Sequence, residues 1–151
     1  MASIRQQIMA NIKTRFTGIT VVAGYQTDIG LNVSEWKDNP WAQDIVSGVE
    51  LRDPECIGAV DAYPTHTFRL PVKATAFAKA GATTAAEIRD KTLADINKAV
   101  GVDPSWGGLA INTEPPTDSI IVEQADKILG GVEVTFVVVF RTKAWDPNTK
   151  M

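Results

Sequence analysis

The sequence predicts an α+β fold in which two helices pack on a mostly antiparallel β-sheet. Two segments have the 3.6-residue periodicity of amphipathic helices, and several others alternate apolar and polar residues as strands do. Only one long helix separates the strands, so the alternation of a doubly wound parallel sheet is missing, and the expected order is α-β-β-β-α-β-β. A chain of 151 residues is expected to form a single domain over residues 1–151.

The first predicted helix covers residues 3–16. Ser3 and Gln6 have the spacing of a capping box, in which each side chain hydrogen-bonds the other residue's backbone. Gly18 is expected to end the helix, because glycine is common just past helix C-termini. Apolar residues recur every four positions and define one buried face: Ile4, Ile8, Ile12 and Phe16.

The second predicted helix covers residues 85–100. Thr84 and Glu87 form another capping box at its start. Gly101, followed by Pro104, is expected to end it. Its inward stripe has helical spacing: Ile88, Thr92, Ile96 and Ala99.

Two long strands are predicted from the alternation of apolar and polar residues. One covers residues 132–143 and follows Gly130 and Gly131, which we expect to form a turn. The other covers residues 66–75 and has one solvated face. Because Pro71 lacks an N–H, we expect this strand to lie at a sheet edge or to bulge at Pro71.

Shorter alternating segments predict strands near residues 31–34, 49–52 and 120–122. The stretches near 37–48 and 53–64 lack such a pattern and are expected to be long loops. Loops of about twelve residues are usually functional or disordered.

Composition excludes several classes of function. Fifteen Lys and Arg residues against eighteen Asp and Glu residues give a net charge of −3, whereas a protein that neutralises nucleic-acid phosphates is usually strongly basic. The longest apolar run, residues 136–140, is far shorter than the roughly 20 residues that span a bilayer. The N-terminus has no apolar signal region. We therefore expect a cytoplasmic chain with no membrane partner.

Residues that commonly carry catalysis are scarce. One His (His66) and one Cys (Cys56) are too few for a zinc site. No nucleophile or carboxylate is linked to His66 in the sequence, and the acidic residues beside Cys56 would raise its thiol pKa. Asp90 and Asp95 have basic neighbours, so we expect them on a solvated helix surface. No phosphate-binding glycine motif is present. We expect no catalytic residue, no cofactor, no metal and no enzyme activity.

Charge is unevenly distributed along the chain. Residues 1–27 hold three basic residues and no acid, whereas residues 38–61 hold six acids and one base. Either both segments are simply solvated, or the acidic loops of one copy meet the basic helix of a neighbouring copy. The candidate residues for such a contact are Arg5, Lys13, Asp44 and Asp53.

Val137 and Val139 place apolar side chains on the otherwise polar face of the last long strand. One explanation is that the two helices cover both faces of the sheet. The other is a contact with another subunit or with a partner. Arg141 and Lys143 follow on the same face and would form a polar rim, which favours an interface at Val139.

The tryptophans lie at the ends of elements or in loops. Trp106 is expected to pack on the rim of the core. Trp41 and Trp145 are expected at a subunit or partner interface, where tryptophan is enriched.

Four segments resemble the tail terminator and minor tail proteins of long-tailed bacteriophages. They are IRQQIMANIKTRF near the N-terminus, GYQTDIG (24–30), GVDPSWGGLA (101–110) and GGVEVTFVVVFRTKAWDPNT (130–149). The likeness runs in order over nearly the whole chain. It implies a small protein with a sheet flanked by helices.

The resemblance also implies a structural role without cofactor or chemistry. Proteins of this family form a homo-oligomeric ring, expected to be a hexamer, on the head-proximal end of the tail tube. The ring stops polymerisation and joins the tail to the neck. The implied partners are other copies of the chain, the tail tube protein and a neck or head-completion protein, with DNA only passing through the lumen. The protein would be assembled in the host cytoplasm and reside in the virion tail.

Two alternatives remain open from the sequence. A neck or head-completion connector would also form a ring. A small α+β ligand-binding domain or enzyme would instead be monomeric, with a deep polar pocket around His66.

Overall fold

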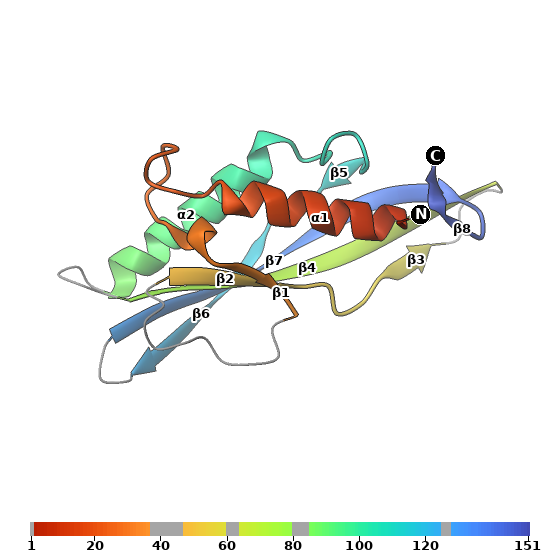
Figure 1. The fold of residues 1–151 in the computed structure, drawn as a ribbon. Helices are drawn as coiled ribbons and strands as arrows, with labels where there is room; N and C mark the ends of the chain where they lie inside the picture. The colour runs from red at the N-terminus through yellow and green to blue at the C-terminus, as the bar shows by residue number, and fades with distance from the viewer. Residues whose placement is uncertain (1, 37–46, 60–63, 80–84, 125–127) are drawn as a thin grey trace.

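The computed structural model describes residues 2–36, 47–59, 64–79, 85–124 and 128–151 (Figure 1). It confirms the α+β class: the described residues form two α-helices, a short 3₁₀ helix and one eight-stranded sheet. The helical elements are α1 (Ile4–Thr17), η1 (Ile29–Leu31) and α2 (Ala85–Val102). The strands are β1 (Val33–Glu35), β2 (Ser47–Arg52), β3 (Ile57–Ala59), β4 (Thr65–Lys79), β5 (Asn112–Thr113), β6 (Thr117–Gln124), β7 (Ile128–Lys143) and β8 (Asp146–Lys150).

The long strands β4 and β7 form the centre of the sheet. They pair antiparallel over the whole length of β4, from Thr65 opposite Lys143 to Lys79 opposite Leu129. On the far side of β4 lie β2 and β3, and on the far side of β7 lie β5, β6 and β8. Within the described strands β1 and β2 make the one parallel pair, so the sheet is mixed and mostly antiparallel.

Both helices lie on the same face of the sheet (Figure 1). The core forms between them and the even-numbered residues from Leu70 to Ala76 in β4 and from Val132 to Phe140 in β7. The Phe136 ring of β7 lies 6.3 Å from the Phe16 ring of α1 and 6.0 Å from the Trp106 ring. Burying one such apolar side chain contributes about 1.5–3 kcal/mol. The fully buried residues of this layer include Ile8, Ile12, Phe16, Leu70, Val72, Ile96, Trp106, Val134, Phe136 and Val138.

The ends of the two helices agree only in part with the sequence prediction. Ser3 and Gln6 form the expected capping box of α1, and Gly18 ends the helix with φ −84°, a right-handed conformation. The prediction that Gly101 ends α2 is wrong, since the helix continues to Val102. Pro104 accounts for the end, because proline disfavours helical geometry in the residue before it. Thr84 lies outside the described residues.

Pro71 marks no bulge, because β4 pairs with β7 without interruption and Pro71 lies opposite Val137. β4 as a whole is not an edge strand, since β2 and β3 pair with its other side, but neither of them pairs at Pro71 itself. The Val137 carbonyl accepts the Glu114 N–H on its other side, so the Pro71 backbone faces away from β7. It faces the interval between Arg52, the end of β2, and Ile57, the start of β3. Proline is tolerated here because no ladder hydrogen bond needs its missing N–H.

Other boundaries also differ from the prediction. No sequence pattern predicts strands β3, β5 and β8, and β3 divides the expected loop over 53–64. Ser47 and Gly48 belong to β2, while the rest of the expected loop over 37–48 lies outside the described residues. Gly130 and Gly131 form no turn, because they pair inside β7 with β4. Leu31 belongs to η1 rather than to a strand.

Trp106 lies in a tight turn after α2. Its backbone is left-handed, with φ 52°. Its side chain is fully buried, so Trp106 packs against the core as expected but lies inside it rather than on its rim. The indole Nε1 donates to the Thr113 hydroxyl at 2.8 Å, and the Arg15 guanidinium lies 4.0 Å from the ring centroid. Asp103 organises the turn by accepting from Ser105 and Gly107; these hydrogen bonds hold the pKa of its carboxyl below the usual value.

The prediction that Asp95 lies on a solvated surface is wrong: the residue is 2% exposed. Its carboxylate accepts the backbone N–H groups of Gln26 and Thr27 and the Thr27 hydroxyl. These bonds attach the GYQTDIG segment to α2. In the same segment Gly30 passes so close to α1 that a Cβ would meet the Phe16 carbonyl oxygen at 2.4 Å. Asp90, by contrast, is exposed as expected.

Replacing Asp95 by Ala should lower the free energy of unfolding by about 2–3 kcal/mol, because buried N–H groups would lose a charged acceptor. Asp90→Ala, an exposed change on the same helix, should stay within about 0.5 kcal/mol of the wild type. Urea unfolding followed by circular dichroism measures both. Equal effects of the two changes would contradict the anchoring role of Asp95.

Candidate functional site

The face of the sheet opposite the helices is the candidate site. Neither helix covers it (Figure 1), which decides against helices on both faces. The odd-numbered residues from Thr65 to Phe77 in β4 and from Glu133 to Lys143 in β7 point to this side, and they are partly buried or exposed rather than fully buried. Val137, Val139, Arg141 and Lys143, expected together on one face, share it.

The middle of the open face is a small apolar strip. Pro71 lies opposite Val137, and Arg69 opposite Val139. An ion pair borders the strip on each side. Arg69 meets Glu114 at 2.5 Å, and on the other side the Lys73–Glu133 pair lies at 3.3 Å. An apolar centre with a charged rim is the arrangement found in protein–protein interfaces.

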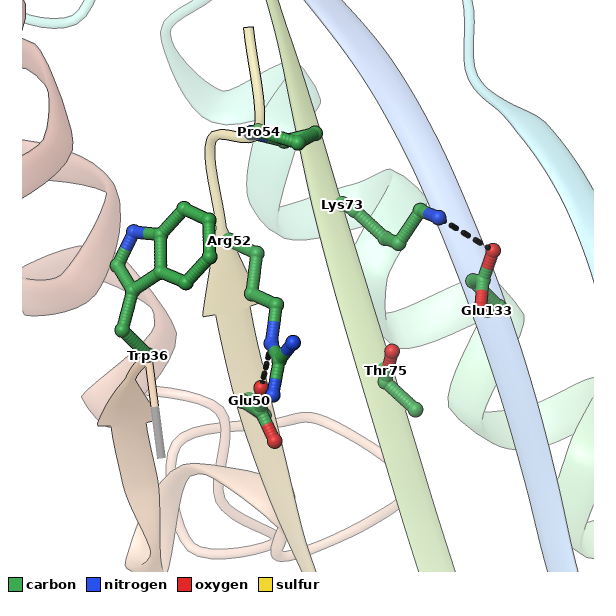
Figure 2. A pocket seen from close by; sticks show the side chains of 7 residues that line it. All are labelled: Trp36, Glu50, Arg52, Pro54, Lys73, Thr75 and Glu133. Atoms are coloured by element: carbon green, nitrogen blue, oxygen red, sulfur yellow. Dashed lines mark hydrogen bonds and ion pairs between the residues drawn. The ribbon is translucent and has the colours of Figure 1, made fainter. Parts of the chain in front are cut away.

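A hollow of about 340 Å³ adjoins this strip on the β2 side. Figure 2 shows the Glu50–Arg52 ion pair of β2 on one side of it and the Lys73–Glu133 pair on the other. The Arg52 guanidinium also lies 5.4 Å from the Trp36 ring centroid. The hollow thus offers cations, carboxylates and ring surface to a partner side chain. Its lining is Trp36, Glu50, Arg52, Pro54, Lys73, Thr75 and Glu133.

Asp53 joins the N-terminal helix to the strands beside the hollow. Arg5 donates from Nε to the Asp53 carboxylate and from Nη2 to its backbone carbonyl, both at 2.8 Å. The Trp36 Nε1 donates to the other carboxylate oxygen at 2.7 Å. Two residues expected to meet across a subunit boundary, Arg5 and Asp53, therefore meet within one chain.

The other residues expected at a charged contact between two copies do not share the surroundings of Arg5 and Asp53. Arg15 also lies near an acid of its own chain, 3.8 Å from Asp103, while Lys13 is exposed on α1. Asp44 and Trp41 lie outside the described residues. A contact between the basic helix of one copy and acidic loops of another stays a prediction, and Arg5 is already engaged in the chain.

An aromatic cluster lies at the far end of the β4–β7 pair. The His66 ring contacts the Trp145 ring edge-on, with 4.8 Å between centroids, and the Phe68 and Phe140 rings stack at 5.3 Å. Trp145 itself is 89% exposed. His66 thus packs among aromatic rings and does not line the hollow.

Cys56 is half-buried in the segment between β2 and β3. Burial raises the pKa of its thiol, and nearby Asp53 raises it further, while Arg5 lowers it. The expected direction is confirmed, although burial rather than acidic neighbours is the main cause. A thiol of raised pKa stays protonated at neutral pH and is a poor nucleophile.

Most residues that line the hollow carry no local sequence signal that marks them as candidates. Trp36, Arg52 and Lys73 are among them. The alternation of apolar and polar residues along β4 and β7 does place Lys73 and Glu133 on the same polar face of the sheet. Their contact also needs the register between the strands, in which Lys73 lies opposite Thr135 and is a diagonal neighbour of Glu133.

Comparison with known proteins finds no matching family model and no matching curated sequence. Neither described helix is long and apolar enough to cross a membrane. Across the described ranges, no three His, Cys, Asp or Glu side chains come together as a metal site would need.

Arg5→Ala should lower the free energy of unfolding by about 1 kcal/mol, because Asp53 loses its charge partner at a partly exposed site. Lys13→Ala, on the exposed face of the same helix, should change it by less than about 0.5 kcal/mol. Urea unfolding of dilute samples measures the intrachain contribution. A destabilisation by Lys13→Ala as large as that by Arg5→Ala would show that the Arg5–Asp53 contact contributes nothing specific.

Alkylation of Cys56 should follow a pH profile displaced to higher pH in the folded protein than in the urea-unfolded chain, because thiolate is the reacting form. Arg5→Ala should displace the midpoint further upward, since Arg5 lowers this pKa. Comparing midpoints rather than rates separates pKa from accessibility, and Lys13→Ala serves as the control. A folded-state midpoint at or below that of the unfolded chain would contradict the raised pKa.

Proposed function

We propose that this chain is a structural virion protein that assembles into a homo-oligomeric ring on the head-proximal end of a phage tail tube. There it stops tube polymerisation and presents a surface for joining the head and neck. The observation that carries the proposal is the one-sided cover of the sheet: both helices pack on one face, and the opposite face has an apolar strip between ion pairs.

The open face is better suited to a contact between proteins than to the solvent-exposed surface of a stable monomer. Val137 and Val139 add apolar area where a strand with one solvated face normally carries polar residues. The ion pairs at its borders supply the polar rim that gives such contacts their register. A specific interface buries on the order of 1,000 Å² or more, so the strip would act together with these rims.

A closed ring needs two different complementary patches on every subunit. The open face supplies one patch, and the exposed end of the β4–β7 pair near Trp145 supplies a second, distant one. The likeness to tail terminators in GYQTDIG and in the closing strand favours the tail end over other ring-forming roles. The protein would be made in the host cytoplasm and end in the virion tail, touching the tube protein and a neck protein.

Val139→Asp tests the open face as an interface. The aspartate should leave a folded monomer at low concentration, because Val139 lies on the face without helices. Ring formation should be lost, and tail tubes grown with this variant should exceed normal length. Circular dichroism, solution mass and electron microscopy of the tails are the measurements.

Val138→Asp is the matched control. Val138 is the residue next to Val139 in β7, and its side chain is fully buried under the helices. This variant should be unfolded or strongly destabilised, because a buried unpaired charge has no compensation. If Val139→Asp unfolds as Val138→Asp does, position 139 belongs to the core. If both wild type and Val139→Asp cap tubes equally, the open face is not the contact. Rings that bind the neck protein but not the tail tube would indicate a neck or head-completion connector instead of a tail terminator.

A further inference from the structure

We propose that Trp145 of one subunit inserts into the hollow on the open face of the next subunit, and that this contact closes the ring. The inference rests on the self-association in the proposed function and names the two patches that self-association would use. The occupant is thus a second copy of this chain. The backbone of Trp145, the chemistry of the hollow and the distance between them lead to this assignment.

All three tryptophans in the described part of the chain have left-handed backbones, with φ 49° at Trp36, 52° at Trp106 and 60° at Trp145. Bulky residues rarely adopt this region, and such strain persists where the surrounding structure compensates it. Trp36 and Trp106 have the compensation within the chain. Each has a guanidinium over its ring and an oxygen that accepts from its Nε1.

Trp145 has no such compensation among the described residues. It lies in the turn between β7 and β8, where Lys143 pairs with Asp146, and it is 89% exposed. The His66 ring meets it edge-on at 4.8 Å. That contact holds the indole in one orientation while leaving most of it in water. A strained, oriented and exposed tryptophan is the kind of residue that anchors protein interfaces.

The hollow offers what the other two tryptophans already have. Lys73 and Arg52 supply cations that can lie against an indole face. The Thr75 hydroxyl and the Glu133 carboxylate supply acceptors for a buried indole N–H. Figure 2 shows these groups around an open space rather than filling it, and about 340 Å³ is larger than an indole.

The two features lie too far apart to meet within one chain. Trp145 follows Lys143, which pairs with Thr65, whereas the hollow includes Thr75, ten residues further along β4. Ten residues of strand span about 33 Å. Insertion therefore joins different parts of two copies. Such head-to-tail contacts form a ring when the rotation between subunits closes.

Two variants each remove one half of the contact. Trp145→Asn deletes the inserted ring with a residue that tolerates the left-handed turn. Thr75→Arg fills the hollow on the solvated face of β4. Each variant alone should be a folded monomer by circular dichroism and solution mass. Val22→Ala, which trims a side chain that is 98% exposed elsewhere, should leave the ring intact.

Mixing the two variants gives the decisive result. The Trp145 of the Thr75→Arg chain can enter the hollow of the Trp145→Asn chain, after which neither free end can extend. The mixture should therefore contain a one-to-one heterodimer and nothing larger. A mixture that stays monomeric, or a Trp145→Asn protein that still forms rings, would overturn the inference.

The same variants distinguish this inference from the proposed function. Rings that depend on Trp145 but do not stop tube growth would overturn the function and keep the contact. Rings that cap tubes and survive Trp145→Asn would keep the function and overturn the contact. If Trp145→Asn leaves the ring intact but abolishes tube binding, the occupant is the tail tube, and the inference is wrong.

Discussion

The antiparallel register of β4 and β7 is the constraint on which the rest of the molecule depends. Side chains alternate between the two faces, so a slip of one residue would move Val134, Phe136 and Val138 out of the core and onto the open face. The same register creates the Lys73–Glu133 contact and places Pro71 beside Val137. Core and candidate site are thus two faces of one pairing, and a change of register would destroy both.

Much of the fold follows from periodicity in the sequence. The four-residue spacing of Ile4, Ile8 and Ile12 predicts α1, and the two-residue alternation from Val132 onward predicts most of β7, because both patterns are long enough to define a face. Strands β3, β5 and β8 have two to five residues, too few to define a period. They form because a long neighbouring strand offers unpaired backbone groups, which local sequence does not reveal.

The candidate site was less predictable, since it depends on contacts between distant residues. Arg5 and Asp53 lie 48 positions apart and belong to segments of opposite charge. That charge separation suggested two copies but equally describes a fold that brings the segments together. Asp95 looked like an ordinary surface acid, and only the approach of the segment holding Gln26 and Thr27 makes it a buried acceptor. The alternation along β7 alone does identify Val137 and Val139 as apolar residues on an otherwise polar face.

The central ladder also has a consequence for folding kinetics. Its paired residues are separated by 50 positions at one end, Lys79 and Leu129, and by 78 at the other, Thr65 and Lys143. Contacts so distant in sequence close slowly, because the loop entropy is lost before the pairing compensates it. The β6–β7 hairpin is local, joining Gln124 to Ile128, and is expected to form first. Strand β4 would then dock on β7 from its Lys79 end, where the sequence separation is smaller, so that the far end beside Trp145 is completed last.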